Sequence, residues 1–351
     1  MPVTPILANL ANQNPNIQSI SELINASIYD DENLQSIISV KKVKQGSPIA
    51  VVGEMGDVGT AGAGCNPTYT AVTIENSLRR WSLGDWDIAK KICYTELENT
   101  YADLTLNGGT EIAEVDEFVE RIVEPRLERA YNRMLWRIAW FGDTAADVIA
   151  NGGVLTAGTD KTLFTVEDGL WKRIFTQGTA NASQVTAIAA NSQTTYAAQK
   201  EAILTQGVAT SLIDTILMDA DSRILNSGAL YLTKSLADAL TADIKKVYKT
   251  NMPWETIFEG VRVAEYDGYK VYSISIWDRI IKTYENTGKA LNKPYRAVLG
   301  NADEFLVGTD TGGLFNNIDI FFDKVSRQEH IYAQGKIGTQ LREVDMFHAA
   351  Y

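Results

Sequence analysis

A run of glycines in the first quarter of the chain is the first feature that could carry chemistry. The stretch "GEMGDVGTAGAGC" (53–65) contains Gly53, Gly56, Gly59, Gly62 and Gly64. A phosphate-binding loop needs Gly-Lys-Ser/Thr followed by a helix, and a dinucleotide site needs a strand before its glycines and a helix after them. Here the following segment, "NPTYTAV", contains a proline and is then β-prone. A flexible loop tip is therefore favoured over a nucleotide site.

An Asp-Thr-Gly tripeptide offers a second chemical possibility. Asp310, Thr311 and Gly312 match the tripeptide of aspartic proteases, in which two carboxylates share a proton across a two-fold or pseudo-two-fold axis. The chain has one copy of it, so a surface turn is the favoured interpretation. An aspartic-protease-like or nucleotide-binding enzyme is kept as the alternative from another functional class.

The histidines and cysteines show no pattern of a reactive or metal site. His330 and His348 are the only histidines, and Cys65 and Cys93 the only cysteines, and none has the spacing of zinc ligands. Without a disulfide framework, manufacture in a reducing, intracellular place fits. A Cys–His catalytic pair stays open, although an incidental thiol is the usual outcome. We expect no catalytic residue, no metal and no cofactor, and hence no enzyme.

The charge of the chain limits its partners. Of its 351 residues, 32 are Lys or Arg and 44 are Asp or Glu, for a formal net charge of -12. That balance argues against a protein that grips nucleic acid electrostatically. Two basic clusters, Lys41-Lys42-Lys44 and Arg79-Arg80, are too short to reverse this conclusion. No apolar run is long enough to span a bilayer, so no membrane partner is expected.

An arm and two β-prone segments surround the glycine stretch. Residues 1–40 are rich in Asn, Gln, Ser and Ile and predict an extended arm. "SPIAVVGE" (47–54) is apolar and β-prone, and "TYTAVTIEN" (68–76) alternates with the period of a strand. Two strands on either side of the glycines predict a protruding hairpin whose tip is mobile until another surface holds it.

The strongest periodic signal is a long amphipathic helix over Asp116–Trp140. Pro125 should kink this helix or begin a second segment, and Gly142 should end it. Its apolar face is expected to consist of Phe118, Ile122, Leu127, Tyr131, Met134, Leu135 and Ile138.

The second half of the chain mixes helices and strands irregularly. The periodicity predicts helices over Ala209–Leu225 and over 235–248, the latter with a weakened capping box of Ser235 and Asp238. A hairpin over 261–276 should turn at Asp267-Gly268. Further strands are expected over 295–301 and in the β-rich segment Ile318–Tyr351. Because no βαβ rhythm and no repeat is present, we predict the α+β class.

The order of these parts resembles the major capsid protein of tailed double-stranded-DNA bacteriophages, a fold shared with encapsulins. An arm and a hairpin of this length need burial against another surface, which is typical of a self-assembling structural protein. The resemblance also includes "VEDGLWKRI" (166–174), "ALYLTKSLADALTADI" (229–244) and the closing "HIYAQGKIGTQLREVDMFHAAY" (330–351).

The resemblance implies a division of the chain and a function. The division is an N-terminal arm (1–44), an extended loop (45–78), a peripheral domain (79–228) with its spine helix at about 116–141, an axial domain (229–318), and C-terminal strands that return to the peripheral domain (319–351). The chain would then self-assemble into pentamers and hexamers of an icosahedral head that encloses double-stranded DNA. Its intersubunit loop residues would be Gly53, Glu54, Gly56, Asp57, Gly59, Gly62 and Gly64.

The implied partners are further copies of the chain, a separate scaffolding protein, a portal, and decoration or head-fibre proteins. DNA would be contacted weakly and without specificity. The protein would be made and assembled in the bacterial cytoplasm and end in the virion capsid. Because residues 45–78 contain no lysine, we expect no isopeptide cross-link from this loop, although some relatives form one. An encapsulin-type compartment is the nearest alternative, which the extra length over about 143–207 disfavours; whether residues 143–207 form an inserted subdomain stays open.

Overall fold

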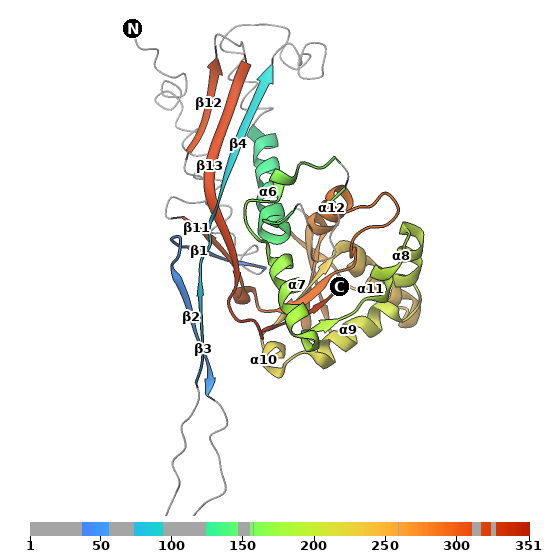
Figure 1. Cartoon of the computed structure of the whole chain (residues 1–351). Helices are drawn as coiled ribbons and strands as arrows, with labels where there is room; N and C mark the ends of the chain where they lie inside the picture. Colours follow the sequence, from blue (N-terminus) through green and yellow to red (C-terminus); the bar gives the residue numbers. More distant parts are fainter. Residues whose placement is uncertain are drawn as a thin grey trace, which may run out of the picture.

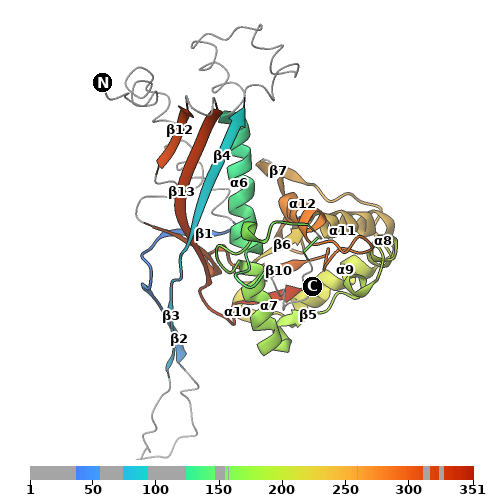
Figure 2. The same ribbon diagram turned by 45° about the horizontal axis from the view of Figure 1, so that its top comes forward.

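The computed structural model describes residues 37–55, 74–93, 124–146, 155–156, 158–258, 260–310, 317–323 and 328–351, and every structural statement below concerns these residues. They form a body of helices packed on a mixed sheet, a second sheet beside it, and a two-stranded hairpin (Figures 1 and 2). The predicted α+β class is confirmed.

A seven-stranded mixed sheet forms the centre of the body. Its strands β6 and β9 are parallel, as are β14 and β5, and the other neighbours are antiparallel. The strands in spatial order are β5 (Val185–Thr186), β14 (Phe347–Ala350), β10 (Ala297–Gly300), β6 (Ala229–Thr233), β9 (Tyr269–Ile274), β8 (Val261–Tyr266) and β7 (Glu255–Phe258).

The alternation of side chains along these strands feeds two hydrophobic cores. In β6, Leu230 and Leu232 enter one core, whereas Tyr231 between them enters the other. Helices α8 (Tyr196–Ile203), α9 (Val208–Asp219), α10 (Ser222–Leu225) and α11 (Lys234–Val247) supply the first core. Helices α6 (Glu124–Phe141), α7 (Leu170–Ala180) and α12 (Ser275–Tyr284) supply the second. Short 3-10 helices lie at η3 (Lys161–Leu163), η4 (Ala182–Gln184), η5 (Ala189–Ser192) and η6 (Ala302–Glu304).

The second sheet is built around one long strand, β13 (Gln328–Leu341). β4 (Gly84–Cys93) pairs along one side of β13. On the other side lie β12 (Asn317–Asp323) and β11 (Phe305–Thr309), and β1 (Ser39–Lys42) adds to β11 as an edge strand. Helix α6 runs alongside β4 and β13 in both views (Figures 1 and 2), and the rings of Trp86 and Tyr131 meet at 5.7 Å between centroids.

The predicted hairpin is present. β2 (Pro48–Met55) pairs with β3 (Ile74–Arg80) in antiparallel register, with an irregularity between Val52 and Met55. Both strands lead away from the helical body (Figure 1). The second strand was predicted at 68–76. The described strand covers 74–80, and residues 68–73 of the prediction lie outside the described residues.

Several other predicted elements are confirmed. Gly142 follows the last residue of α6, as predicted, whereas residues 116–123 of the predicted helix lie outside the described residues. The hairpin turn at Asp267-Gly268 has φ values of 49° and 81°, as a tight turn with two left-handed residues requires.

Other predictions were wrong in an instructive way. The helix expected over 209–225 is interrupted, since Ala220 is extended and the Asp221 carboxylate accepts the Arg223 N–H to cap α10. The capping box of Ser235 and Asp238 does not form: the Ser235 N–H donates to the carboxylate of Asp278, 3.0 Å away. Asp278 belongs to α12, a helix that begins where the alternation through Ile276 predicted a strand. The residues of α7 and α8 were also not predicted as helices.

Candidate assembly site

The predicted loop residues lie partly within and partly outside the described residues. Gly53 and Glu54 lie in β2. Gly56, Asp57, Gly59, Gly62 and Gly64 lie outside the described residues, as does Cys65. The site is therefore built from the two strands and from the place where they join the body, residues 44–48 and 79–84, here named the hairpin root.

Backbone hydrogen bonds close the hairpin root across its two segments. The Gly46 N–H donates to the Trp81 carbonyl at 2.9 Å, and the Trp81 N–H donates to the Ser47 carbonyl at 3.0 Å. Gly46 has a φ of 74°, which a glycine adopts without strain. The side-chain oxygen of Gln45 accepts the Leu83 N–H at 2.6 Å. The two segments thus meet in a fixed register before the strands leave the body.

The root is also anchored in the second sheet. Trp81 is only 4% exposed and lies over Gly308 of β11, where a Cβ would come within 2.5 Å of the indole ring. Arg79 donates to the Leu341 carbonyl at 2.7 Å. Because β11 and β13 both contact the root, its orientation is set by strands from the far end of the sequence.

A segment before and within α7 holds the root from the other side. This segment, Val166 to Arg173 and here named the junction segment, contains most of the "VEDGLWKRI" motif. A Cβ on Gly84 would lie 1.9 Å from the Val166 carbonyl oxygen, and a Cβ on Gly338 would lie 2.2 Å from that of Ser82. Two backbones can approach this closely only where glycine stands.

A buried ion pair crosses the junction. Arg173 contacts Glu167 at 2.9 Å and also donates to Thr339 at 3.0 Å and to Gln340 at 3.3 Å. Glu167 accepts a further bond from the Ser82 hydroxyl at 3.2 Å. Burial raises the pKa of Glu167, and the Arg173 guanidinium opposes that rise. The pair joins α7 to the root and to β13 at once.

Asp168 ties the end of α6 to the start of α7. Its carboxylate accepts the N–H and the hydroxyl of Thr144 at 2.9 and 2.7 Å, and Lys172 at 2.7 Å. Burial acts to raise the pKa of Asp168, but the bonds from Lys172 and Thr144 outweigh it and lower that pKa. Lys172 also pairs with Asp143, and the Gly169 N–H donates to the Gly142 carbonyl at 2.8 Å.

The apolar face predicted for the long helix is seated in the core where the structure describes it. Tyr131, Leu135 and Ile138 are buried, and Met134 packs against the same core. Leu127 is half-buried, whereas Phe118 and Ile122 lie outside the described residues. Next to this face, Trp140 meets Trp277 at 4.5 Å and Trp171 at 5.9 Å between ring centroids. The helix is thereby fixed to α7 and α12.

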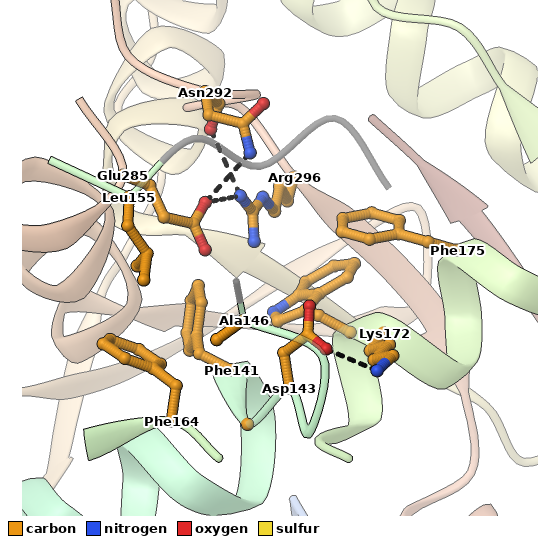
Figure 3. A pocket seen from close by; sticks show the side chains of 12 residues that line it. Phe141, Asp143, Ala146, Leu155, Phe164, Lys172, Phe175, Glu285, Asn292 and Arg296 are labelled. Atoms are coloured by element: carbon orange, nitrogen blue, oxygen red, sulfur yellow. Dashed lines mark hydrogen bonds and ion pairs between the residues drawn. The ribbon is translucent and has the colours of Figure 1, made fainter. Parts of the chain in front are cut away.

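A small pocket of about 40 Å³ lies between the end of α6, α7 and the segment after α12 (Figure 3). Its charged side chains are paired: Arg296 contacts Glu285, and Lys172 contacts Asp143. The Arg296 guanidinium also lies within 5.2 to 5.5 Å of the Phe141, Trp171 and Phe175 rings. Paired charges within an aromatic box indicate a structural role.

The other candidates for chemistry are not brought together. The ring of His348 is buried and lies 2.8 Å from the Thr186 hydroxyl, and burial lowers its pKa. His330 lies in β13, Cys93 ends β4, and Asp310 follows β11 while Thr311 and Gly312 lie outside the described residues. Within the described ranges, no three His, Cys, Asp or Glu side chains form a possible metal site. None of the described helices is both long and apolar enough to cross a membrane.

Sequence reasoning missed the roles of Glu167, Asp168 and Arg173. The signal that could have found them is the motif "VEDGLWKRI" itself, whose charged residues alternate with glycine and buried apolar residues. Their partners lie far away in the sequence, at Thr144, Ser82 and Thr339.

Comparisons with known proteins locate the fold. No family model and no curated protein matches the chain. A solved structure from Mycobacterium phage Ogopogo is 11% identical, covers 90% of this chain and 89% of its own, and has a TM-score of 0.51. A satellite phage P4 procapsid structure is 10% identical over 94% of this chain and 98% of its own (TM-score 0.48). The capsid of a native GTA particle is 11% identical over 93% and 89% (TM-score 0.46).

Of these, the Ogopogo structure is similar enough to establish the architecture. It matches nearly the whole length of both chains. The chain therefore shares the α+β fold of that phage structure.

Proposed function

We propose that this chain is a structural major capsid protein that self-assembles into the pentamers and hexamers of an icosahedral phage head enclosing double-stranded DNA. The observation that carries the proposal is the hairpin. Within the described residues no further strand pairs with β2 or β3, and both lead away from the body (Figure 1). A two-stranded ribbon is marginally stable alone in water, so another surface must cover it. In a capsid fold, a neighbouring copy supplies that surface.

The proposal assigns roles to the parts named from the sequence. The loop residues 53–64 contact a neighbouring copy, and the arm (1–44) lies across neighbours. The spine helix, including α6, stiffens the peripheral domain (79–228), to which the strands of 319–351 return. The axial domain (229–318) clusters around the five- and six-fold axes. Residues 185–228 and 347–351 add strands to the same seven-stranded sheet and share its hydrophobic core. We therefore include them in the proposed axial domain.

The partners of such a protein complete the proposal. A separate scaffolding protein guides closure, a portal occupies one vertex, and decoration or head-fibre proteins bind the finished shell. The acidic chain contacts the packaged DNA weakly and without specificity. Assembly takes place in the bacterial cytoplasm, and the protein ends in the virion.

Electron microscopy of negatively stained protein, combined with sedimentation, tests the proposal. Closed shells, or rings of five and six, are expected with or without the scaffolding protein. A stable small monomer in every condition would contradict it. Deletion of residues 55–64 should leave the body folded, as judged by circular dichroism, and impair assembly. Normal shells from that deletion would refute the role of the loop.

A further inference from the structure

The fold brings together two basic clusters that the sequence keeps apart. Lys41 and Lys44 lie on and just after β1, and Arg80 ends β3. All three side chains are exposed. Arg80 donates to the Gly46 carbonyl at 3.2 Å, and the Lys44 carbonyl accepts the Ser47 hydroxyl at 2.6 Å. The clusters therefore meet at the hairpin root, where the hairpin leaves the body.

These cations have no acidic partner among the described residues. In the described ranges, no ion pair forms at Lys41, Lys44 or Arg80. Arg79 differs, because it is partly buried against the Leu341 carbonyl and Asp345 lies near it. A basic surface without ion pairs among the described residues attracts an acidic partner, and this chain has a net charge of -12.

An exposed apolar side chain stands beside the cations. Leu78, two residues before Arg80 in β3, is 64% exposed. An apolar spot rimmed by arginine and lysine is the anatomy of a protein interface, whereas a phosphate backbone needs no apolar contact. The two-stranded hairpin next to it, which pairs with no further described strand, also requires a protein surface. A protein partner is thus favoured over nucleic acid.

We propose that Lys41, Lys44, Leu78 and Arg80 form a docking surface, the basic root, for a carboxylate-rich surface of a second copy of this chain. The proposal rests on the proposed function, since it names the chemistry by which neighbouring copies meet. With 44 acidic residues against 32 basic ones, each copy presents ample carboxylates. The contact is heterologous, because a basic surface meets a different, acidic one, and such contacts close into rings.

Charge reversal tests the surface. The triple variant K41E/K44E/R80E should raise the critical concentration for assembly by about tenfold, which corresponds to about 1.4 kcal/mol. The difference in critical concentration between the wild type and the triple variant should shrink as salt is added, because salt screens the attraction between exposed charges. A control variant, K90E/K91E/R129E, reverses the same number of exposed charges on β4 and α6, outside both the hairpin and the proposed axial domain, and should assemble as the wild type does. Circular dichroism checks that both variants fold.

Carbodiimide cross-linking of assembled wild-type particles identifies the partner directly. This reagent joins a lysine amine to a carboxylate at contact distance and takes up the released water as a urea. Particles assembled from equal parts of ¹⁴N- and ¹⁵N-labelled chains should give mixed-label peptides that join Lys41 or Lys44 to an Asp or Glu. The variant K41R/K44R keeps both charges, so it should assemble normally and lose these cross-links.

The outcomes separate this proposal from the proposed function. A wild type that never assembles contradicts the proposed function before any variant is compared. Normal assembly of the triple variant, or cross-links within single chains only, overturns the basic root and leaves the lysines as guards of the β1 edge. Retention of short duplex DNA by the wild type, lost in the triple variant while assembly is unchanged, overturns it in favour of nucleic acid.

Discussion

At the junction segment, polar side chains bond across three elements, whereas the backbones of β2 and β3 pair with each other and with no further described strand. Glu167 and Arg173 link α7 to the root and to β13. Along the hairpin, by contrast, Leu78 stands exposed beside the ladder. The two regions are in contact at Ser82 of the hairpin root, but they are stabilised by different interactions.

This difference separates folding from assembly. The junction is closed within one chain, and its loss should therefore destabilise the monomer. In the proposed function the hairpin is covered by a neighbouring copy, so changes there should affect assembly while the monomer stays folded. The predictions below test this separation, beginning with the largest expected effect.

The variant Gly338→Ala should lower the stability of the monomer most, because Gly338 of β13 packs against Ser82 of the hairpin root. Its Cβ would lie 2.2 Å from the Ser82 carbonyl oxygen, a backbone atom that cannot move aside cheaply. We expect a loss of about 3 kcal/mol in the free energy of unfolding, measured by urea titration. Gly268→Ala is the control: it has open space around it but a φ of 81°, and it should cost about 1 kcal/mol. Equal losses of unfolding free energy in the two variants would show that the close approach of β13 to the hairpin root is unimportant for stability.

The variant Arg173→Leu should leave Glu167 buried without its cation. At pH 7 we expect a loss of about 3 kcal/mol in the free energy of unfolding. Burial already raises the pKa of Glu167, so the folded state binds a proton more readily than the unfolded state. Stability of the variant should then recover as the pH falls toward 5. A deficit that is unchanged between pH 7 and pH 5 would contradict a buried, charged Glu167.

Asp168→Asn should have a smaller effect, because this carboxylate is partly exposed. The variant weakens the bonds from Thr144 and Lys172 and should lose about 1 kcal/mol at pH 7. The lowered pKa of Asp168 means that its contribution is complete above the ordinary value of 3.8 and is lost as the pH falls through the lowered one. Urea titrations of both proteins should therefore converge in strong acid, and a constant difference would count against this bond network.

Leu78→Ala should change the monomer least. Because the side chain is 64% exposed, we expect less than about 0.5 kcal/mol in the free energy of unfolding. Light scattering should nevertheless show slower assembly than in the wild type. A monomer destabilised as strongly as by Gly338→Ala would erase the contrast between the two regions.

The sequence predicted those elements whose conformation depends mainly on residues close together in the chain. Asp267-Gly268 predicted its turn, since both residues tolerate the positive φ values that a tight two-residue turn requires, and the periodicity over 235–248 predicted α11. The start of α12 was not predictable in this way. Its first residues continue a strand-like alternation, and the helix is favoured by the burial of Trp277 and Ile281 and by the bond of Asp278 to α11.

In the candidate site, too, the locally encoded parts were predicted and the long-range contacts were not. The two strands of the hairpin were predicted from alternation and from the glycines between them. The roles of Glu167 and Arg173 were not, because their partners stand at Ser82 and Thr339 and only the folded chain brings these together. Likewise, the two basic clusters look like separate solvated faces until the root joins them.

The pairing of β1 with β11, and of β11 with β13, has a consequence for the order of events in the cell. The N-terminal strand that precedes the hairpin waits for a partner more than two hundred residues later, at Leu306 to Thr309. A chain still on the ribosome therefore lacks the strands that fix the direction of its hairpin. In the proposed function, a chain therefore gains a correctly directed hairpin for its neighbours only after its last strands have been synthesised.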